Sequence, residues 1–336
     1  MVLPWGALGV QLFFVLSGFL ITGILLGLRD GTDGSPGRLH RLRQFYVRRS
    51  LRILPIAYFV VVITAILNVQ AMRETLPWNL TYTTNVYFAL RGAWNGPATH
   101  LWSLAVEEQF YLLWPWLMLL LPDRYLLPTI VGSIVIASFT LLVGSIVQLN
   151  PVALTVLTPA CMDRFGVGAL LAWLRYKRPI QFHELAQKRA YRWSLVATLP
   201  AVVATIVLTR YHGVVEPISS LCTATFFGWI IHRAAVGFSG VWGRLLEARV
   251  LVYCGKISYG IYLYHNFMHT LVPFLLRPLR IPYPHAPLLE FMTCLGATLL
   301  VAACSWTFFE RPINEFRQRF EYWNAAPARM SINATD

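Results

Sequence analysis

The sequence has few charged residues for its length. Asp, Glu, Lys and Arg make up 13% of the 336 residues, against about 25% in soluble globular proteins. Hydrophobic residues make up 57%, and the mean hydropathy is +0.55. This composition excludes a disordered chain, a coiled coil and an ordinary cytosolic enzyme, because each of these needs more charge or less apolar content.

Cysteine patterns that would indicate a disulfide framework or a metal site are also missing. The cysteines are odd in number, lie in apolar segments and form no CxxC pair: Cys161, Cys222, Cys254, Cys294 and Cys304. Small buried hydrophobic side chains are the better interpretation. No signal peptide, internal repeat or low-complexity linker is evident. We therefore expect one membrane domain over residues 1–321 and a short cytoplasmic tail over residues 322–336.

Long apolar runs dominate the rest of the chain. About 20 mostly apolar residues are enough to span the hydrocarbon core of a bilayer as a helix. Nine runs approach this length, over residues 9–28, 53–70, 103–121, 126–147, 158–174, 193–209, 218–236, 251–273 and 288–309. The sequence therefore predicts an all-α fold, a polytopic transmembrane helix bundle of about nine spans.

The basic residues predict how this bundle is oriented. The chain carries 28 Lys and Arg against 15 Asp and Glu, a net charge of +13. If residues 29–52 are cytoplasmic, 22 of the basic residues fall on that side of the nine spans and five on the other. Basic loops mark the cytoplasmic side of membrane proteins. The pattern predicts a multi-pass inner or plasma membrane protein with a cytoplasmic C-terminus, and it explains the charge without nucleic-acid binding.

Three arginines stand at the start of the second predicted span, within the segment FYVRRSLRILP: Arg48, Arg49 and Arg52. Arg48 and Arg52 are four residues apart, so on a helix they share one face and form a fork for an anion. A topological stop signal and a phosphate-binding site are both compatible with this charge.

Two adjacent carboxylates, Glu107 and Glu108, enter the third predicted span. His100, Glu107 and Tyr111 are spaced to lie on one helical stripe. A histidine with a carboxylate suits proton transfer, whereas a polar belt at the membrane interface is the alternative. Two acidic residues anchor a helix poorly at the outer interface, so we favour the functional interpretation.

Three further patterns concern helix faces. One face near the eighth span carries Ser258, Tyr262, His265 and His269, and we expect this polar stripe to point into the bundle. The two histidines lack a nearby glutamate and a third ligand, so we expect no metal site. Gly23 and Gly27 form a GxxxG pair that predicts close helix packing. Glu310 and Arg311 are interpreted as anchors at the inner interface.

Five segments in order resemble the acyltransferase 3 family of membrane-bound O-acyltransferases. They are LFFVLSGFLIT, FYVRRSLRILP, WSLAVEEQFYLLWP, ISYGIYLYH and FFERP. The resemblance extends over nearly the whole chain, from Gly9 to Pro312. The resemblance implies an enzyme that takes an acyl group, usually acetyl, from cytoplasmic acyl-CoA. The acceptor would be a hydroxyl of a cell-envelope sugar, of peptidoglycan or of a natural product such as a macrolide.

The same resemblance assigns roles to residues. Arg48, Arg49 and Arg52 would bind acyl-CoA (acetyl-CoA) as co-substrate, because guanidinium groups match phosphate oxygens. Acyl transfer to a hydroxyl also needs a base and a group that holds the developing oxyanion. The candidate catalytic residues are His100, Glu107, Glu108 and His265. The implied partners are acyl-CoA, the glycan or natural-product acceptor and the lipid bilayer, with no metal and no nucleic acid.

The resemblance also has a departure. Family members begin with a helix that ends in a histidine, the implied base, and this chain starts after it. Nine spans with an inside C-terminus likewise place Met1 outside, and Gln11 stands where the family usually has Asp. A late start codon or a catalytically degenerate member acting as an envelope-assembly partner would explain this. A small-solute transporter that uses bundle-facing His, Glu and Arg is the other alternative.

Overall fold

The computed structural model describes residues 5–29, 37–69, 72–94, 97–188, 191, 198, 215–238, 240–278, 280, 283 and 286–320. Every regular element in these residues is a helix, which confirms the predicted all-α class. Apart from Thr198, the predicted span over 193–209 lies outside the described residues, as does the predicted tail over 322–336.

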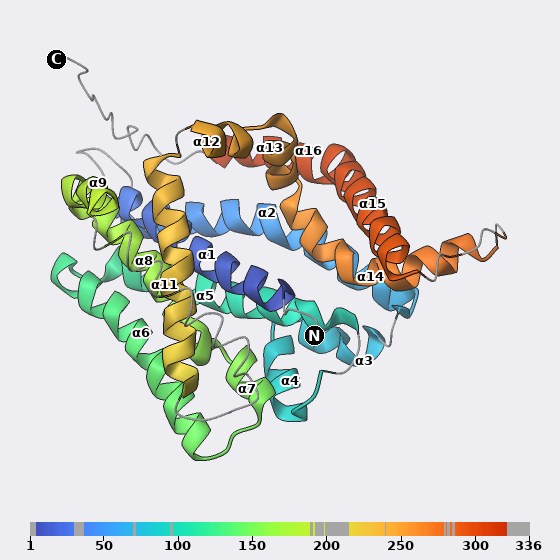
Figure 1. The fold of residues 1–336 in the computed structure, drawn as a ribbon, viewed down its shortest axis with the longest axis horizontal. Coiled ribbons are helices and arrows are strands. Elements are labelled where there is room, and N and C mark those ends of the chain that lie inside the picture. Colours follow the sequence, from blue (N-terminus) through green and yellow to red (C-terminus); the bar gives the residue numbers. More distant parts are fainter. Residues whose placement is uncertain are drawn as a thin grey trace.

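The first half of the fold contains α1 (Trp5–Arg29), α2 (Arg38–Ile66), α3 (Met72–Leu80), α4 (Thr84–Arg91), the 3₁₀ turn η2 (Pro97–His100), α5 (Leu101–Leu120), α6 (Asp123–Ile146), α7 (Pro151–Val156) and α8 (Thr158–Lys177). The second half contains α9 (Pro179–Gln187), α11 (Val215–Val236), α12 (Gly240–Leu246), α13 (Arg249–Lys256), α14 (Ser258–Leu276), α15 (Pro287–Ser305), the π-helical turn η3 (Trp306–Glu310), α16 (Arg311–Arg317) and the 3₁₀ turn η4 (Gln318–Phe320). Figure 1 shows these helices packed as one bundle.

The described residues contain five helical segments that are long and apolar enough to cross a membrane. They are Gly6–Arg29, Arg38–Ile66, Asp123–Ile146, Pro151–Lys177 and Pro287–Arg317, and α11 with α12 would add a sixth, bent span. The predicted count of nine spans is therefore not confirmed, although several long apolar helices agree with an integral membrane protein.

Two of the predicted spans are not single regular α-helices in the structure. The run over 251–273 forms two helices, α13 and α14, because Ile257 between them has φ −94° and ψ 7°, outside the helical region. The run over 288–309 leaves α-helical geometry after Ser305 and passes through the π-helical turn η3 into α16. Apolar composition alone does not register such local breaks.

The basic segment before the second predicted span is itself helical. Helix α2 begins at Arg38 and continues through Pro55 to Ile66 without a break. Arginine and leucine are good helix formers, and they make up much of its first half. Consequently Arg48, Arg49 and Arg52 are fixed on one rigid helix, and their directions follow from helical spacing.

Close packing of α1 against α8 depends on two glycines. A Cβ at Gly18 would lie 2.1 Å from the Phe165 carbonyl oxygen, and one at Gly168 would lie 2.0 Å from that of Val15. No described atom lies within 4 Å of a Cβ placed at Gly23 or Gly27. The GxxxG prediction was therefore wrong about which glycines make the contact, because spacing does not show which helix face meets a neighbour.

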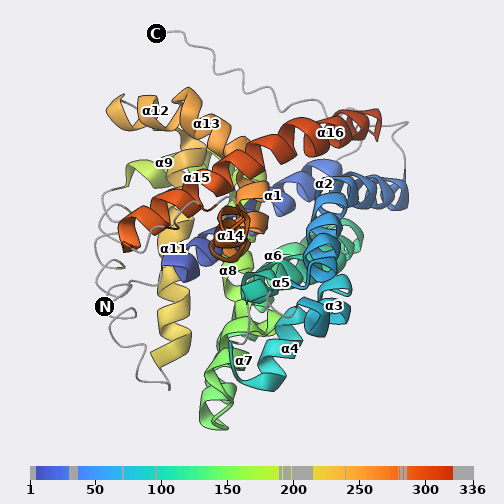
Figure 2. The same ribbon diagram turned by 90° about the vertical axis from the view of Figure 1, so that its right-hand side faces the viewer.

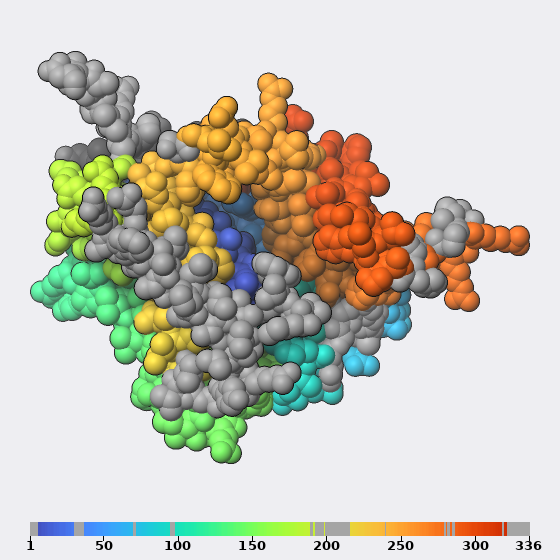
Figure 3. Space-filling model, in the orientation of Figure 1, coloured from blue at the N-terminus to red at the C-terminus, as the bar shows by residue number. Residues whose placement is uncertain are grey.

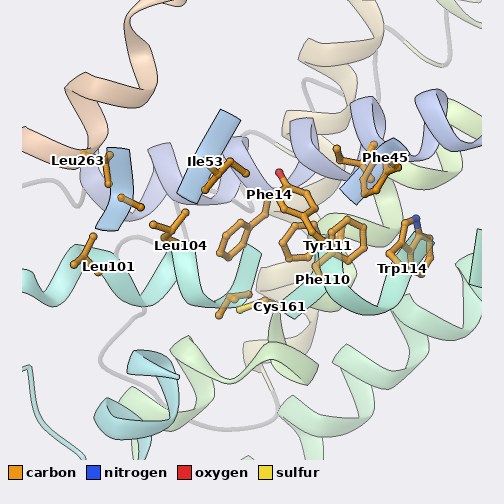
Figure 4. Close-up of a cluster of buried hydrophobic side chains, with 14 of the residues drawn as sticks. Phe14, Phe45, Ile53, Leu101, Leu104, Phe110, Tyr111, Trp114, Cys161 and Leu263 are labelled. Atoms are coloured by element: carbon orange, nitrogen blue, oxygen red, sulfur yellow. The ribbon is translucent and has the colours of Figure 1, made fainter. Parts of the chain in front are cut away.

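The main core lies between α1, α2, α5, α8 and α14. Figure 4 shows its labelled side chains in a row along α5. The ring of Phe165 stacks between Phe14, at 4.7 Å, and Phe110, at 4.2 Å between centroids. Trp114 donates from Nε1 to the Thr22 hydroxyl over 2.8 Å, so even this buried indole is paired.

The molecule has two distinct ends along the direction of its spans. Helices α9, α12, α13 and α16 gather at one end with the first half of α2, and α3, α4 and α7 lie at the other (Figures 1 and 2). We call the first the basic end, because its helices carry the arginine-rich segments. At this end Arg29 donates to the Leu121 carbonyl over 2.7 Å and pairs with Asp123 at 2.5 Å, while Lys177 pairs with the same carboxylate at 2.9 Å.

Candidate active site

A cavity of about 800 Å³ opens at the basic end. Helices α2, α13, α14 and α16 and the turn η3 form its walls. Its cationic side chains are Arg52, Lys256, Arg311 and Arg317, and its carboxylates are Glu310 and Glu315. Tyr253, Tyr259 and Trp306 supply aromatic surface. We call this cavity the basic pocket.

The arginines of α2 point in two directions. Arg52 lines the basic pocket, and Arg48 donates to the Phe320 carbonyl over 2.9 Å, so both face the α16–η4 segment. The four-residue spacing predicted this common face. Arg49 instead lies in the core, where its Cζ atom is 3.9 Å from the centroid of the Tyr111 ring.

Glu310 is a buried residue of the basic pocket lining. This side chain is buried in the π-helical turn and accepts a hydrogen bond from Ser305 Oγ over 3.1 Å. Gly260 on α14 leaves room for it, since a Cβ there would lie 3.2 Å from Glu310 Oε1. Glu310 thus faces inward, so the expectation of a plain interfacial anchor was wrong for this residue. Arg311 pairs with Glu315 at 2.8 Å on the rim.

A buried polar cluster joins α1, α2 and α5: Ser17, Arg49, Glu107 and Tyr111. Ser17 Oγ donates to Glu107 Oε1 over 2.7 Å, and Arg49 Nη2 lies 3.4 Å from the same oxygen. The Tyr111 hydroxyl donates to Glu107 and accepts from Arg49. The Glu107 and Arg49 side chains are 3% and 18% exposed. We call this set the central ion pair cluster; a charge at such depth needs a partner of opposite sign.

The two residues that follow Glu107, Glu108 and Gln109, point elsewhere. Gln109 donates to the Tyr82 carbonyl over 2.8 Å and to Asn85 Oδ1 over 2.9 Å, which ties α5 to the segment before and within α4. The buried Oε1 atom of Glu108 has no hydrogen-bond partner among the described residues. Adjacent positions on a helix are about 100° apart, so the three side chains necessarily reach different surroundings.

His100 and His265 form a second cluster, between η2 and α14. His100 belongs to η2, and its ring centroid lies 5.0 Å from that of His265 on α14. The Tyr262 hydroxyl donates to the His100 carbonyl over 2.6 Å and lies 2.9 Å from Ser103 Oγ. The Nδ1 atom of His265 is 2.7 Å from the Tyr262 carbonyl. We call this set the histidine cluster.

The predicted stripe of His100, Glu107 and Tyr111 is divided between these clusters. His100 contacts α14, whereas Glu107 and Tyr111 contact α1 and α2. The 3₁₀ turn before Leu101 has about three residues per turn, so the α-helical register does not extend back to His100.

The polar stripe on α14 follows the prediction only at Tyr262, whose hydroxyl contacts His100 and Ser103 in the bundle. Ser258, His265 and His269 are exposed, and the residues that α14 buries include Gly260, Leu263 and Phe267. The apolar face of α14 therefore packs on the bundle, as burial of hydrophobic surface favours. Ser17 and Tyr259 are site residues that the sequence reasoning did not select; their place within two of the five motifs was the available signal.

No group of three or more His, Cys, Asp and Glu side chains within the described part of the chain is arranged to hold a metal ion. Comparison with solved structures gives no match. The chain is 25% identical to the peptidoglycan O-acetyltransferase OatA of Listeria monocytogenes, over 92% of this chain and 51% of that protein. It is 30% identical to the putative peptidoglycan O-acetyltransferase YrhL of Bacillus subtilis, over 92% of this chain and 50% of that protein.

A putative O-acetyltransferase of Staphylococcus aureus, SACOL0978, is 27% identical over 93% of this chain and 53% of its own length. The chain thus spans about half the length of the curated relatives it matches. The acyltransferase domain family Acyl_transf_3 matches residues 1–308. This match covers four of the five motifs and ends at Phe308, the first residue of FFERP, so the chain is an integral membrane protein that belongs to the acyltransferase 3 family.

Proposed function

We propose that the protein transfers an acyl group, specifically acetyl, from acyl-CoA to a hydroxyl of a cell-envelope glycan. The observation that carries the proposal is the basic pocket, in which Arg52 of the predicted anion fork meets three further cations. Coenzyme A carries a diphosphate, a further phosphate and an adenine. Guanidinium groups bind phosphate oxygens in a fork geometry, and aromatic rings such as Trp306 offer a stacking surface.

The basic end also supports a proposal for the membrane orientation. We place the basic end in the cytoplasm, where acyl-CoA is made, because basic segments mark the cytoplasmic side. The chain would then lie in the inner or plasma membrane with its C-terminus inside.

Helix α14 relates the basic pocket to the histidine cluster. Ser258 and Tyr259 line the pocket, and His265 follows seven residues after Ser258 on the same helix. At a rise of 1.5 Å per residue, this separation along the helix axis is about 10 Å. A thioester bound at the end of the pocket nearest α14 would therefore lie a short distance from the two histidines.

We assign proton transfer to His100 and His265. One imidazole nitrogen takes the proton of the acceptor hydroxyl as its oxygen attacks the thioester carbonyl carbon. The carbon–sulfur bond then breaks, and the CoA thiolate leaves and takes up a proton. The ester forms on the acceptor oxygen, so one acyl group and one proton are exchanged between the two substrates.

The carboxylates receive different roles in this proposal. Glu107 Oε1 already interacts with Ser17, Arg49 and Tyr111, so we assign it to holding Arg49 and the α2 helix in place. Glu108 keeps a buried oxygen without a hydrogen-bond partner among the described residues, and we retain it as a candidate acid or base.

The relatives favour this function over the alternatives. Two of the reported relatives are named for O-acetyl transfer to peptidoglycan, and the third for O-acetyl transfer. That supports a glycan acceptor and disfavours a solute transporter or a purely structural partner.

The test is acetyl transfer by the protein in proteoliposomes with labelled acetyl-CoA and a peptidoglycan fragment as acceptor. Arg52→Ala removes a charged phosphate contact and should raise KM for acetyl-CoA about 10- to 100-fold. Arg43→Ala is the matched control, because Arg43 lies on the same helix and is exposed outside the pocket. An unchanged KM in Arg52→Ala, or label transfer that does not need the pocket cations, would contradict the donor assignment.

A further inference from the structure

Two short helices at the basic end leave most of their apolar side chains uncovered. On α12, Val241 and Trp242 are 68% and 67% exposed, and on α13 Val250 is 73% exposed. Helix α13 buries none of its eight residues in the protein. An uncovered apolar surface of this kind marks an interaction site for a protein or a membrane.

The pattern of α13 separates two faces. Arg249 and Lys256 are seven residues apart and share one face, and Lys256 lines the basic pocket. Val250, Leu251 and Cys254 occupy the opposite face. One face of this helix therefore turns its charge toward the pocket, and the other turns apolar side chains away from the protein.

Helix α12 lies across the end of the bundle. It is bent by 91° from α11, and it sits at the outer surface of the basic end (Figures 1 and 3). Helix α11 has 22 residues and is therefore about 33 Å long, which already matches the hydrocarbon core. The residues of α12 are thus left to lie along the plane of the membrane surface.

The composition of the pair indicates what covers it. The two helices and their connection carry Arg244, Arg249 and Lys256 against one acidic residue, Glu247. Basic residues combined with Trp and branched apolar side chains are typical of helices that lie at the boundary between headgroups and acyl chains. The basic charge is complementary to anionic headgroups.

We propose that α12 and α13 form an interfacial element that binds anionic phospholipid at the basic end. Its apolar face enters the boundary between headgroups and acyl chains, and its cations contact the headgroups. Because Tyr253 and Lys256 of α13 line the basic pocket, the lipid also holds one wall of that pocket in place. This last consequence rests on the proposed function, whereas the lipid contact does not.

The test places a fluorescent label at Val250→Cys, in a background with the five native cysteines replaced. The protein is reconstituted in phosphatidylglycerol vesicles that contain a nitroxide-labelled phospholipid. We expect strong quenching of this label and little quenching at Glu184→Cys, an exposed polar position of α9 at the same end. Equal, weak quenching at both positions would overturn the proposal and favour a protein partner.

The anionic requirement has its own comparison. The double variant Arg244→Gln with Arg249→Gln leaves the pocket residues intact and should weaken quenching in phosphatidylglycerol. The affinity of the α12–α13 element for the lipid surface should fall by up to about five-fold for each cation removed. Equal docking of the unmodified element in phosphatidylcholine would also overturn the anionic assignment. If the cysteine-free background fails to fold, hydrogen exchange of the α12–α13 amides in unmodified protein, in vesicles of each lipid, gives the same distinction.

Activity separates the two proposals. If acetyl transfer occurs and its KM for acetyl-CoA is lower in phosphatidylglycerol than in phosphatidylcholine, the element controls the pocket. Quenching of the Val250→Cys label without acetyl transfer in either lipid would count against the proposed function and leave the lipid contact supported.

Discussion

Arg49 and Arg52 stand three residues apart on one helix, yet they lie in opposite kinds of environment. Arg49 is enclosed by Glu107 and Tyr111 in the central ion pair cluster, and its charge is matched within the protein. Arg52 lines the basic pocket, where cations outnumber carboxylates. The comparison teaches that one arginine motif can place its charges in two environments: one is paired inside the core, and the other lines an open cavity, where we propose that it binds the donor.

The largest effect should come from removing the carboxylate of the central ion pair cluster. Glu107→Leu leaves the Arg49 guanidinium buried without its partner, and breaking a buried pair in this way costs about 3–5 kcal/mol of stability. Thermal unfolding of the purified protein in detergent measures the loss. The double variant Arg49→Leu with Glu107→Leu should recover much of it, since no unpaired charge remains. Equal stability of the single and double variants would contradict the conclusion that Arg49, unlike Arg52, depends on a buried partner.

The basic pocket should respond in substrate binding instead of stability. Arg52→Ala should leave the unfolding temperature nearly unchanged while KM for acetyl-CoA rises about 10- to 100-fold. Arg52→Lys keeps the charge but loses the fork geometry, so an intermediate KM is expected. Acetyl-CoA titration in proteoliposomes provides the measurement, and a large fall in stability of Arg52→Ala would place Arg52 with Arg49.

The close contact of α1 with α8 offers a test in the core that does not involve charge. Gly18→Ala would force a methyl group against the Phe165 backbone, and overpacking of this kind costs about 1–3 kcal/mol. Gly23→Ala is the matched control in the same helix, and it should be neutral or slightly stabilising because alanine is the better helix former. Unfolding temperatures of the two variants decide this, and equal losses would argue against the close approach at Gly18.

The smallest effect is expected on the rim of the basic pocket. Arg311 and Glu315 are paired, but their side chains are 64% and 58% exposed. Glu315→Gln should change stability by less than about 1 kcal/mol, as for other exposed pairs. It should lower KM for acetyl-CoA modestly, because one negative charge leaves the pocket. A raised KM would indicate that Glu315 binds the donor.

The predicted placement of the candidate site residues agrees with the structure only in part. The spacing of Arg48 and Arg52 correctly predicted a common face, because both lie on one continuous helix. The stripe from His100 to Tyr111 failed where a 3₁₀ turn changed the register. The approach of His100 to His265 could not be predicted, since the two residues are distant in sequence and meet only through the packing of α14 on η2.

By itself the sequence determined the all-α class, the membrane character and the family, because these depend on apolar runs and contiguous motifs. Only the tertiary structure decided which arginine is paired in the core and which lines the basic pocket, where helices break, and which glycine permits close packing. The physical reason is that partners such as Glu107 for Arg49 come from other helices, and burial and charge pairing depend on which helix faces meet.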